Sequence, residues 1–508
     1  MPSIPSTTAP SRRLAALRPA ELARIGAFAV AVLAVELVLA KGASAPEIPK
    51  YILGFIGLFA IAVVFRFPMA TALVLFALTD FIFYPTFFAY QAGSNSIRPH
   101  EVALFCLLLL ALVRPKENTW GGAAGGGLLA FLLLVMLSAG LAVSDGTTTV
   151  TEAWNWGRPM LPLLFFWVVV RLFPSAESRR VLLTGAVILA AIAGVVALFV
   201  SLGAGFGTTL QEEGGNTVNE GETAGSGIRV RLAGLSAAYA LFWFTFVQVA
   251  SKVGRRRLFW GLGLAGMILG IAVSLNRNMW IGIILGLALM AVLGGNLVRN
   301  RLAIGIVLAI GGIALLLAVG GSDTQSHVIQ PIVKRGETLL SPSKTSQENS
   351  LQSRDLETSK AWGVAQDNLL TGVGAGVPFG VFIYEPVMVS GITIGIQAIP
   401  QLFLHNQYLY LILISGLPGL IAFLVFLGVP LYKALTRRPR DPFITSLGVG
   451  LALIMISAVV AIYFTSVDMT AMLGLLTGVI MADVNGRAKE GRDSGLGGRR
   501  KLEEPSPV

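Results

Sequence analysis

Residues 416–433 read GLPGLIAFLVFLGVPLYK, and residues 404–415, directly before them, read LHNQYLYLILIS. A helix needs about 20 mostly apolar residues to cross the hydrocarbon core of a bilayer, so the run 416–433 predicts a membrane span. The polar residues that begin at His405 mark the point where a loop returns to this span. A loop held by a rigid scaffold is a common place for function.

The composition of the whole chain agrees with this interpretation. Of the 508 residues, 55% are hydrophobic and only 13% are charged, whereas soluble domains carry about 25% charged residues. The apolar runs are continuous rather than alternating, which is typical of helices and not of a β-barrel. We therefore expect an integral membrane protein that crosses the bilayer with helices.

Similar apolar runs repeat along the chain and predict an all-α polytopic membrane protein with about 14 transmembrane helices. The predicted spans lie at residues 25–41, 51–65, 68–84, 99–113, 124–143, 159–173, 181–203, 233–251, 258–275, 279–297, 302–320, 416–433, 443–464 and 467–482. Residues 1–24 form a basic tail that precedes the first span.

The basic residues predict the orientation, because Lys and Arg in short connections favour the cytoplasm. They lie on alternate connections, which explains the net charge of +11 without any nucleic-acid partner: Arg66, Arg114, Lys116, Arg171, Arg179, Arg180, Arg255 to Arg257, Arg299, Arg301, Arg437, Arg438 and Arg440. The tails 1–24 and 483–508 share their side, so both termini are expected in the cytoplasm. The other side then receives 144–158, the outer loop 204–232 within the span-rich region 25–320, and one large extracytoplasmic loop at 321–415, which precedes the last spans at 416–482.

Several residue types exclude other chemistry. Cys106 is the single cysteine, so no intrachain disulfide is expected. His100 and His327 have no second ligand at metal-binding spacing, and no metal site or cofactor is predicted. The segment containing Gly372, Gly374 and Gly376 lacks the Lys-Ser/Thr of a phosphate-binding loop, so we interpret it as a turn that needs positive φ.

The candidate site residues all fall on the predicted outer side. His405, with Asn406 and Tyr408 beside it, could accept a proton near neutral pH; the plainer alternative is a histidine that hydrogen-bonds near a helix start. Arg277 lies between two spans where the orientation trend disfavours it, although snorkelling beside an interfacial Trp280 would also explain it.

Three further arginines lie in outer loops: Arg229, Arg231 and Arg354. Each alone is compatible with a solvated loop charge. Together with Arg277 they suit a doubly charged diphosphate, because guanidinium groups bind phosphate through paired hydrogen bonds.

The motifs from residue 229 to residue 433 resemble the bacterial O-antigen ligase and O-antigen polymerase family. In chain order the matching pieces are Arg231-Leu-Ala-Gly234-Leu, Asn276-Arg277, Arg354 followed by Trp362, Leu369-Leu-Thr-Gly-Val-Gly374, and His405-Asn406-x-Tyr408-Leu409 followed by Gly416-Leu-Pro-Gly-Leu420. Two pieces depart from the family pattern, since Asn276 replaces a serine and Ser236-Ala237-Ala238 replaces a Pro-Asn. The second departure makes Arg229 a substitute candidate for Arg231.

The resemblance implies a metal-independent membrane glycosyltransferase whose donor is an undecaprenyl diphosphate-linked glycan. It implies His405 as the base and Arg231, Arg277 and Arg354 as ligands of the donor diphosphate. The partners would be that donor, an acceptor glycan or glycolipid, and membrane lipids, at the outer face of a bacterial inner membrane. Whether the enzyme is a ligase or a polymerase stays open.

Two alternatives compete with this hypothesis. The number of spans, together with Asp80 and Glu36 inside them, is compatible with a transporter or a flippase of lipid-linked glycans, although the internal symmetry typical of transporters is not evident. A peptidoglycan-type polymerase would also use a polyprenyl diphosphate donor, with a loop aspartate as its base.

Overall fold

The computed structural model describes the middle and C-terminal parts of the chain: residues 66–80, 90–92, 95–113, 120–201, 223–224, 227–228, 234–296, 298–303, 349–380, 382–389, 392–400, 402–437 and 440–500. Its α-helices are α3 (Pro68–Asp80), α4 (Pro99–Val113), α5 (Gly122–Ser144), α6 (Val150–Gly157), α7 (Phe165–Leu172), α8 (Ala176–Ser201), α9 (Leu235–Ser251), α10 (Gly254–Val273), α11 (Arg277–Leu293), α15 (Asn349–Asp367), α16 (Gln407–Thr436), α17 (Pro442–Ser457) and α18 (Val467–Arg500).

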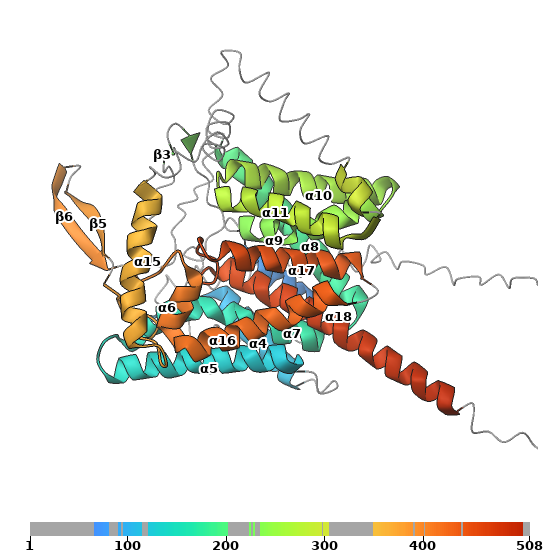
Figure 1. The fold of residues 1–508 in the computed structure, drawn as a ribbon, viewed down its shortest axis with the longest axis horizontal. Helices are drawn as coiled ribbons and strands as arrows, with labels where there is room; N and C mark the ends of the chain where they lie inside the picture. The colour runs from blue at the N-terminus through green and yellow to red at the C-terminus, as the bar shows by residue number, and fades with distance from the viewer. Residues whose placement is uncertain are drawn as a thin grey trace, which may run out of the picture.

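The described part is a helical bundle, and most of its helices run side by side (Figure 1). Among the described residues, five helices are long and apolar enough to cross a membrane: α5, α8, α10, α16 and the first part of α18. Five shorter apolar helices accompany them, namely α3, α4, α9, α11 and α17. The predicted spans at 25–41 and 51–65, and nearly all of 302–320, lie outside the described residues.

Strands form a minor part of the structure that the sequence interpretation did not foresee. Three two-stranded antiparallel hairpins are present: β1 (Tyr90–Ala92) with β2 (Asn95–Ile97), β3 (Thr223–Ala224) with β4 (Gly227–Ile228), and β5 (Phe382–Val389) with β6 (Ile392–Pro400). The last hairpin lies within the region predicted as the large loop. It projects beyond α15 at one end of the bundle (Figure 1).

Three predicted spans have different bounds in the structure. The span at 159–173 begins as a 3₁₀ helix, η2 (Arg158–Leu164), because Pro159 and Pro162 remove backbone donors. The span at 443–464 ends at Ser457, and turns follow it. The span at 416–433 is part of α16, whose helix begins earlier, at Gln407, so His405 lies two residues before a membrane helix.

α16 packs against α5 along much of its length (Figure 1). Small residues allow the two backbones to approach closely, as is common between membrane helices: a Cβ atom added at Gly127 would lie 2.8 Å from the carbonyl oxygen of Ala422. The rings of Phe131 and Phe423 fill the interface with their centroids 4.8 Å apart. The pairing fixes the position of α16 within the bundle.

The backbone of α16 is interrupted at Gly416, where φ is 70° and ψ is 176°. The interruption frees the carbonyl oxygen of Leu413, which accepts hydrogen bonds from the backbone N–H groups of Val373 (2.6 Å) and Gly374 (3.1 Å). The N–H group of Leu417 donates instead to the carbonyl oxygen of Leu369, at 2.7 Å. The loop after α15 thus completes the broken helix.

This loop has the positive φ angles predicted for it, with values of 69° at Gly372, 99° at Gly374 and 83° at Gly376. Each of the three glycines touches another element, since added Cβ atoms would meet α16 at Gly372, α5 at Gly374 and α6 at Gly376. The loop is therefore a packed connection, and two of its N–H groups already serve Leu413. A phosphate-cradling role is not needed to explain these glycines.

The opposite end of the bundle collects basic residues from separate connections. Asp483, in the middle of α18, accepts from Arg179 at 3.2 Å and from Arg437 at 3.3 Å. Burial lowers the pKa of Lys252, and repulsion from Arg180 and Arg256 lowers it further by a smaller amount. Basic residues that follow α7, α9 and α16 therefore share one end of the bundle.

We expect Gly416→Ala to destabilise the protein and Gly428→Ala, on the same helix, to leave its stability nearly unchanged. Alanine at position 416 would adopt a backbone conformation that costs about 1–3 kcal/mol, and its Cβ would collide with the carbonyl oxygen of Leu370. No atom lies within 4 Å of a Cβ added at Gly428. Thermal unfolding of the two purified variants in detergent measures the difference; equal midpoints would show that the interruption of α16 is not a structural requirement.

Candidate functional site

α15 runs across the end of the bundle, nearly perpendicular to α5 and α16 (Figure 1). Its sequence is polar, but Glu357, Ala361 and Ala365 are spaced by four residues and form one buried face. The alanines bring α15 close to α16. Part of the region predicted as the loop 321–415 is therefore a helix lying across the ends of the other helices.

The buried face of α15 carries a carboxylate that holds His405. One oxygen of Glu357 accepts from the backbone N–H of His405 at 2.8 Å, and the other lies 2.9 Å from its Nδ1. The Glu357 side chain is 7% exposed and that of His405 is 30% exposed. Both carboxylate oxygens are thus engaged by a single residue, whose imidazole remains partly open to solvent.

The residues that follow His405 start α16 and tie it to its neighbours. Asn406 is the N-cap, and its side-chain oxygen accepts from the N–H of Leu409 at 3.2 Å. The hydroxyl of Tyr408 donates to the carbonyl oxygen of Met455 in α17 at 2.6 Å. Asn406 and Tyr408 therefore have structural roles at the start of α16, which the sequence alone did not assign to them.

The segment 458–466, which connects α17 and α18, contacts the start of α16. The buried Gln407 accepts from the N–H of Phe464 at 3.0 Å, and its own N–H donates to the carbonyl oxygen of Ala458 at 3.0 Å. Arg354, one turn before Glu357 on α15, reaches the carbonyl oxygen of Val460 at 3.3 Å through its Nη1. Arg354 and His405 therefore lie at one end of the bundle, connected through α15.

Arg277 is the first residue of α11, which Asn276 caps by accepting from the N–H of Asn278 at 3.1 Å. The turn before it holds Leu275 at a φ of 51°, an uncommon conformation for a branched residue. Trp280 donates its indole N–H to Ile271 in α10 at 3.0 Å. This indole bond is a structural contact that the interpretation of Trp280 as a simple lipid anchor did not include.

Aromatic residues connect the start of α11 with the segment 458–466. A Cβ added at Gly282 would meet the ring of Tyr239, whose hydroxyl lies 2.9 Å from that of Ser457 and whose ring stacks on Tyr463 at 6.2 Å. This chain of contacts places Arg277 at the same end of the bundle as His405. It does not bring the two residues into direct contact.

The structure does not describe the two other arginines predicted to bind the diphosphate. Arg229 and Arg231 lie outside the described residues, as do Glu36 and His327. His100 is buried at the start of α4, beside a pair in which Nε of Arg158 lies 2.8 Å from Glu101. Among the residues that the structure describes, no group of three or more His, Cys, Asp or Glu could hold a metal ion.

α6 completes the surroundings of the glycine loop. Its capping box joins Thr149 and Glu152, and the hydroxyl of Thr148 donates to the carbonyl oxygen of Gly376 at 3.2 Å. Hydrogen bonds from the backbone N–H and then the hydroxyl of Thr149 lower the pKa of Glu152. The cap is therefore complete above the ordinary glutamate pKa and weakens as the pH falls through the lowered value.

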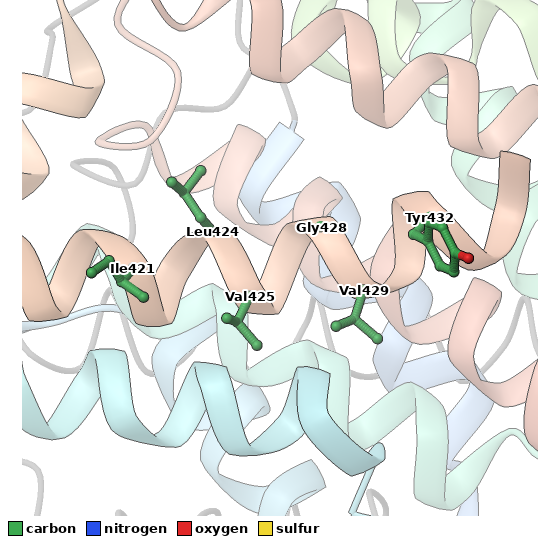
Figure 2. A pocket seen from close by; sticks show the side chains of 6 residues that line it. All are labelled: Ile421, Leu424, Val425, Gly428, Val429 and Tyr432. Carbon is green, nitrogen blue, oxygen red and sulfur yellow. The ribbon is translucent and has the colours of Figure 1, made fainter. Parts of the chain in front are cut away.

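An exposed apolar face covers the second half of α16, the helix that His405 precedes. Its residues follow the helix one turn after another, as Figure 2 shows: Ile421, Leu424, Val425, Gly428, Val429 and Tyr432. Ile421 is 54% exposed and Tyr432 is 69% exposed. The surface has the character of a face that contacts acyl chains.

Glu357 is the site residue that the sequence interpretation missed. Its signal was the spacing of four that it shares with Ala361 and Ala365. A glutamate in a polar helix ordinarily faces water, so this spacing alone did not indicate burial. Only the fold, which lays α15 over the start of α16, shows what the carboxylate contacts.

Together, the apolar helices and the polar cluster at one end define the chain as an α-helical membrane protein with a candidate site at the end of its bundle. Residues 262–424 match the family model described as O-antigen ligase. The match supports membership of the O-antigen ligase and polymerase family and confirms the resemblance predicted from the motifs. It covers about a third of the chain and includes Arg277, Arg354, Glu357 and His405.

The match begins within α10 and ends within α16, so it includes α11, α15, the β5–β6 hairpin and the glycine loop. The outer arginines Arg229 and Arg231 precede it. No curated protein matches the chain.

We expect Gln407→Leu to loosen the segment 458–466. Leucine fills a similar volume but leaves the buried N–H of Phe464 without its acceptor, at a cost of about 1–3 kcal/mol. The hydrogen bond from Nε2 of Gln407 to the carbonyl oxygen of Leu404 is lost as well, so the effect is measured at the Phe464 amide itself. Hydrogen exchange at the Phe464 amide should accelerate in the leucine variant, and unchanged exchange would show that this hydrogen bond does not hold the segment.

Proposed function

We propose that this protein is a membrane glycosyltransferase of the O-antigen ligase or polymerase type. It moves a glycan from an undecaprenyl diphosphate carrier to an acceptor hydroxyl at the outer face of a bacterial inner membrane. The observation that carries the proposal is His405, a partly exposed imidazole held at the start of a membrane helix within the matched region. The match to the O-antigen ligase family model supports the reaction class.

His405 is proposed as the base. A sugar hydroxyl is a weak nucleophile and needs a proton acceptor within hydrogen-bonding distance. The imidazole has one nitrogen beside Glu357, which leaves the other nitrogen for a hydroxyl. Asn406 and Tyr408 support this position by capping α16 and by fixing it to α17.

The arginines are proposed to bind the donor diphosphate. Negative charge develops on the diphosphate as the glycosidic bond breaks, and guanidinium groups fixed in a partly desolvated site stabilise that charge. Arg354 and Arg277 reach the end of the bundle that holds His405. Arg229 and Arg231 are proposed as further ligands from the preceding outer loop, without any metal ion.

The remaining features of the proposal concern the membrane. The polyprenyl chain of the donor would lie against apolar helix surfaces, and the exposed apolar face over the second half of α16 offers such a surface (Figure 2). We propose about 14 spans, cytoplasmic termini and an extracytoplasmic site. The collection of Arg179, Arg437 and Lys252 at the other end of the bundle supports this orientation.

We expect His405→Ala to abolish glycan transfer in a strain whose surface polysaccharide depends on this protein. Loss of a general base lowers the rate by about 10²–10⁴-fold, so lipid-linked glycan should accumulate while the abundance of the protein stays normal. Electrophoresis of surface glycans, with extraction of the lipid-linked pool, measures both outcomes. Normal polysaccharide in this variant would refute the proposed base.

Purified protein in vesicles tests the alternative of transport. A flippase would move lipid-linked glycan across vesicles that contain only the purified protein, and it would form no new glycosidic bond. If the deletion strain leaves complete chains on the carrier, the protein is a ligase; if long chains are missing, it is a polymerase.

We expect Arg354→Ala to weaken transfer and Lys360→Ala to leave it unchanged. Both residues are basic and lie on α15, but Lys360 is exposed on another face. Losing a charged hydrogen-bond donor to phosphate costs about 1.5–3 kcal/mol, so kcat/KM for the donor should fall by about 10–150-fold. Arg354→Lys should recover only part of the loss, and equal rates for the Arg354→Ala and Lys360→Ala variants would remove Arg354 from the donor site.

A further inference from the structure

We infer that Glu357 is the positioning residue of His405: it holds the proton on Nδ1 and so keeps Nε2 free to accept the proton of the acceptor hydroxyl. The inference rests on the proposed function and adds to it a residue that none of the sequence motifs contains.

The carboxylate of Glu357 fixes His405 at two points. Oε1 accepts from the backbone N–H at 2.8 Å, and Oε2 lies 2.9 Å from Nδ1. The first bond sets the position of the backbone and the second sets the rotation of the ring. The Glu357 side chain is almost completely buried, whereas the ring of His405 is partly exposed, so the carboxylate acts from behind the imidazole.

The pair determines the tautomer of the neutral imidazole. An ionised carboxylate only accepts hydrogen bonds, so the nitrogen beside it must carry the hydrogen. With the hydrogen on Nδ1, the lone pair lies on Nε2. The nitrogen away from Glu357 is therefore the one that can take a proton.

The chemical step follows from this arrangement. The acceptor oxygen bonds to the anomeric carbon of the donor sugar while the bond from that carbon to the diphosphate oxygen breaks. The diphosphate leaves with the electron pair of the broken bond, and the proton of the acceptor hydroxyl moves to Nε2 of His405. Glu357 then stabilises the imidazolium that forms, without receiving a proton itself.

The fold explains why Glu357 can serve this role. Ala361 and Ala365 continue its face of α15 and are fully buried, so the helix lies close to the start of α16. The charged neighbours point elsewhere: Arg354 reaches the carbonyl oxygen of Val460, and Asp355 is exposed on another face. Asp355 therefore offers a matched control, an acid on the same helix turn outside the pair.

The test compares Glu357→Gln with Asp355→Asn in the full-length protein. Glutamine has the same shape but only one acceptor oxygen, so its NH₂ group would face either the backbone N–H or Nδ1 of His405. If it faces Nδ1, it donates there and moves the ring hydrogen to Nε2, where it blocks the base. We measure transfer with lipid-linked glycan extracted from the deletion strain and with membranes of that strain as the acceptor.

We expect Glu357→Gln to lower kcat by about 10²–10⁴-fold, the range for a lost general base, with the KM for the donor nearly unchanged. Asp355→Asn should retain the full rate. Glu357→Asp keeps both acceptor oxygens and should recover part of the activity. A thermal unfolding midpoint within a few degrees of the parent protein would show that the loss is not a loss of folding.

A double variant separates positioning from a purely structural role. If Glu357 acts through His405, adding Glu357→Gln to His405→Ala should leave the residual rate unchanged, because groups that act as a unit are not additive. Losses that multiply would overturn the inference, as would a full rate in the Glu357→Gln variant.

The failure of the proposed function has a different signature. Full transfer by His405→Ala would refute the base itself, and the inference about Glu357 would fall with it. An inactive His405→Ala variant together with a fully active Glu357→Gln variant would refute only the positioning role. If Glu357→Gln does not fold, Glu357→Met, which has a similar length but no acceptor oxygen, decides: a folded variant with the lowered kcat expected for Glu357→Gln would support the inference, and one with the kcat of the parent would overturn it.

Discussion

The structure depends on a repair of backbone hydrogen bonding: a neighbouring loop supplies new partners where a helix is interrupted. A helix that breaks within an apolar environment must find new partners for its freed polar groups, because hydrocarbon offers none. α16 breaks at Gly416, and the loop after α15 supplies donors to Leu413 and an acceptor for Leu417. The repair fixes the loop to the helix, and with it the end of α15.

This connection explains how a carboxylate reaches the imidazole. α15 is polar, and a helix with few apolar residues has little tendency to associate with a bundle by burial alone. It is held at its C-terminal end by the glycine loop and along its face by Ala361 and Ala365 against α16. Glu357 lies on this face, and its bonds to His405 join α15 to the residue before α16. Structural support and candidate chemistry therefore share the same contacts.

The sequence indicated some of these features and not others, for physical reasons. Continuous apolar runs predicted the helices, because hydrophobic length is a local property. Position alone selected His405, and the orientation trend selected Arg277. Glu357 and the β5–β6 hairpin were missed. The burial of Glu357 depends on which helix covers its face of α15, and this is not a local property of the sequence. The hairpin shows only a weak alternation of apolar residues in a region interpreted as loop.

The predicted sidedness follows from similar local physics. Basic residues on alternate connections indicated that they share one side, and the contacts of Asp483 with Arg179 and Arg437 place two of those connections together. The details of each helix end depended on packing instead. The early start of α16 and the 3₁₀ segment η2 are examples that hydropathy could not resolve.

The β5–β6 hairpin lies between two anchored points. Before it, the glycine loop is bonded to Leu413; after it, His405 is bonded to Glu357 and Gln407 to Ala458. Insertions or deletions within the hairpin would therefore leave the positions of the imidazole and its carboxylate unaltered. The length and composition of this extension can therefore change independently of the contact between His405 and Glu357.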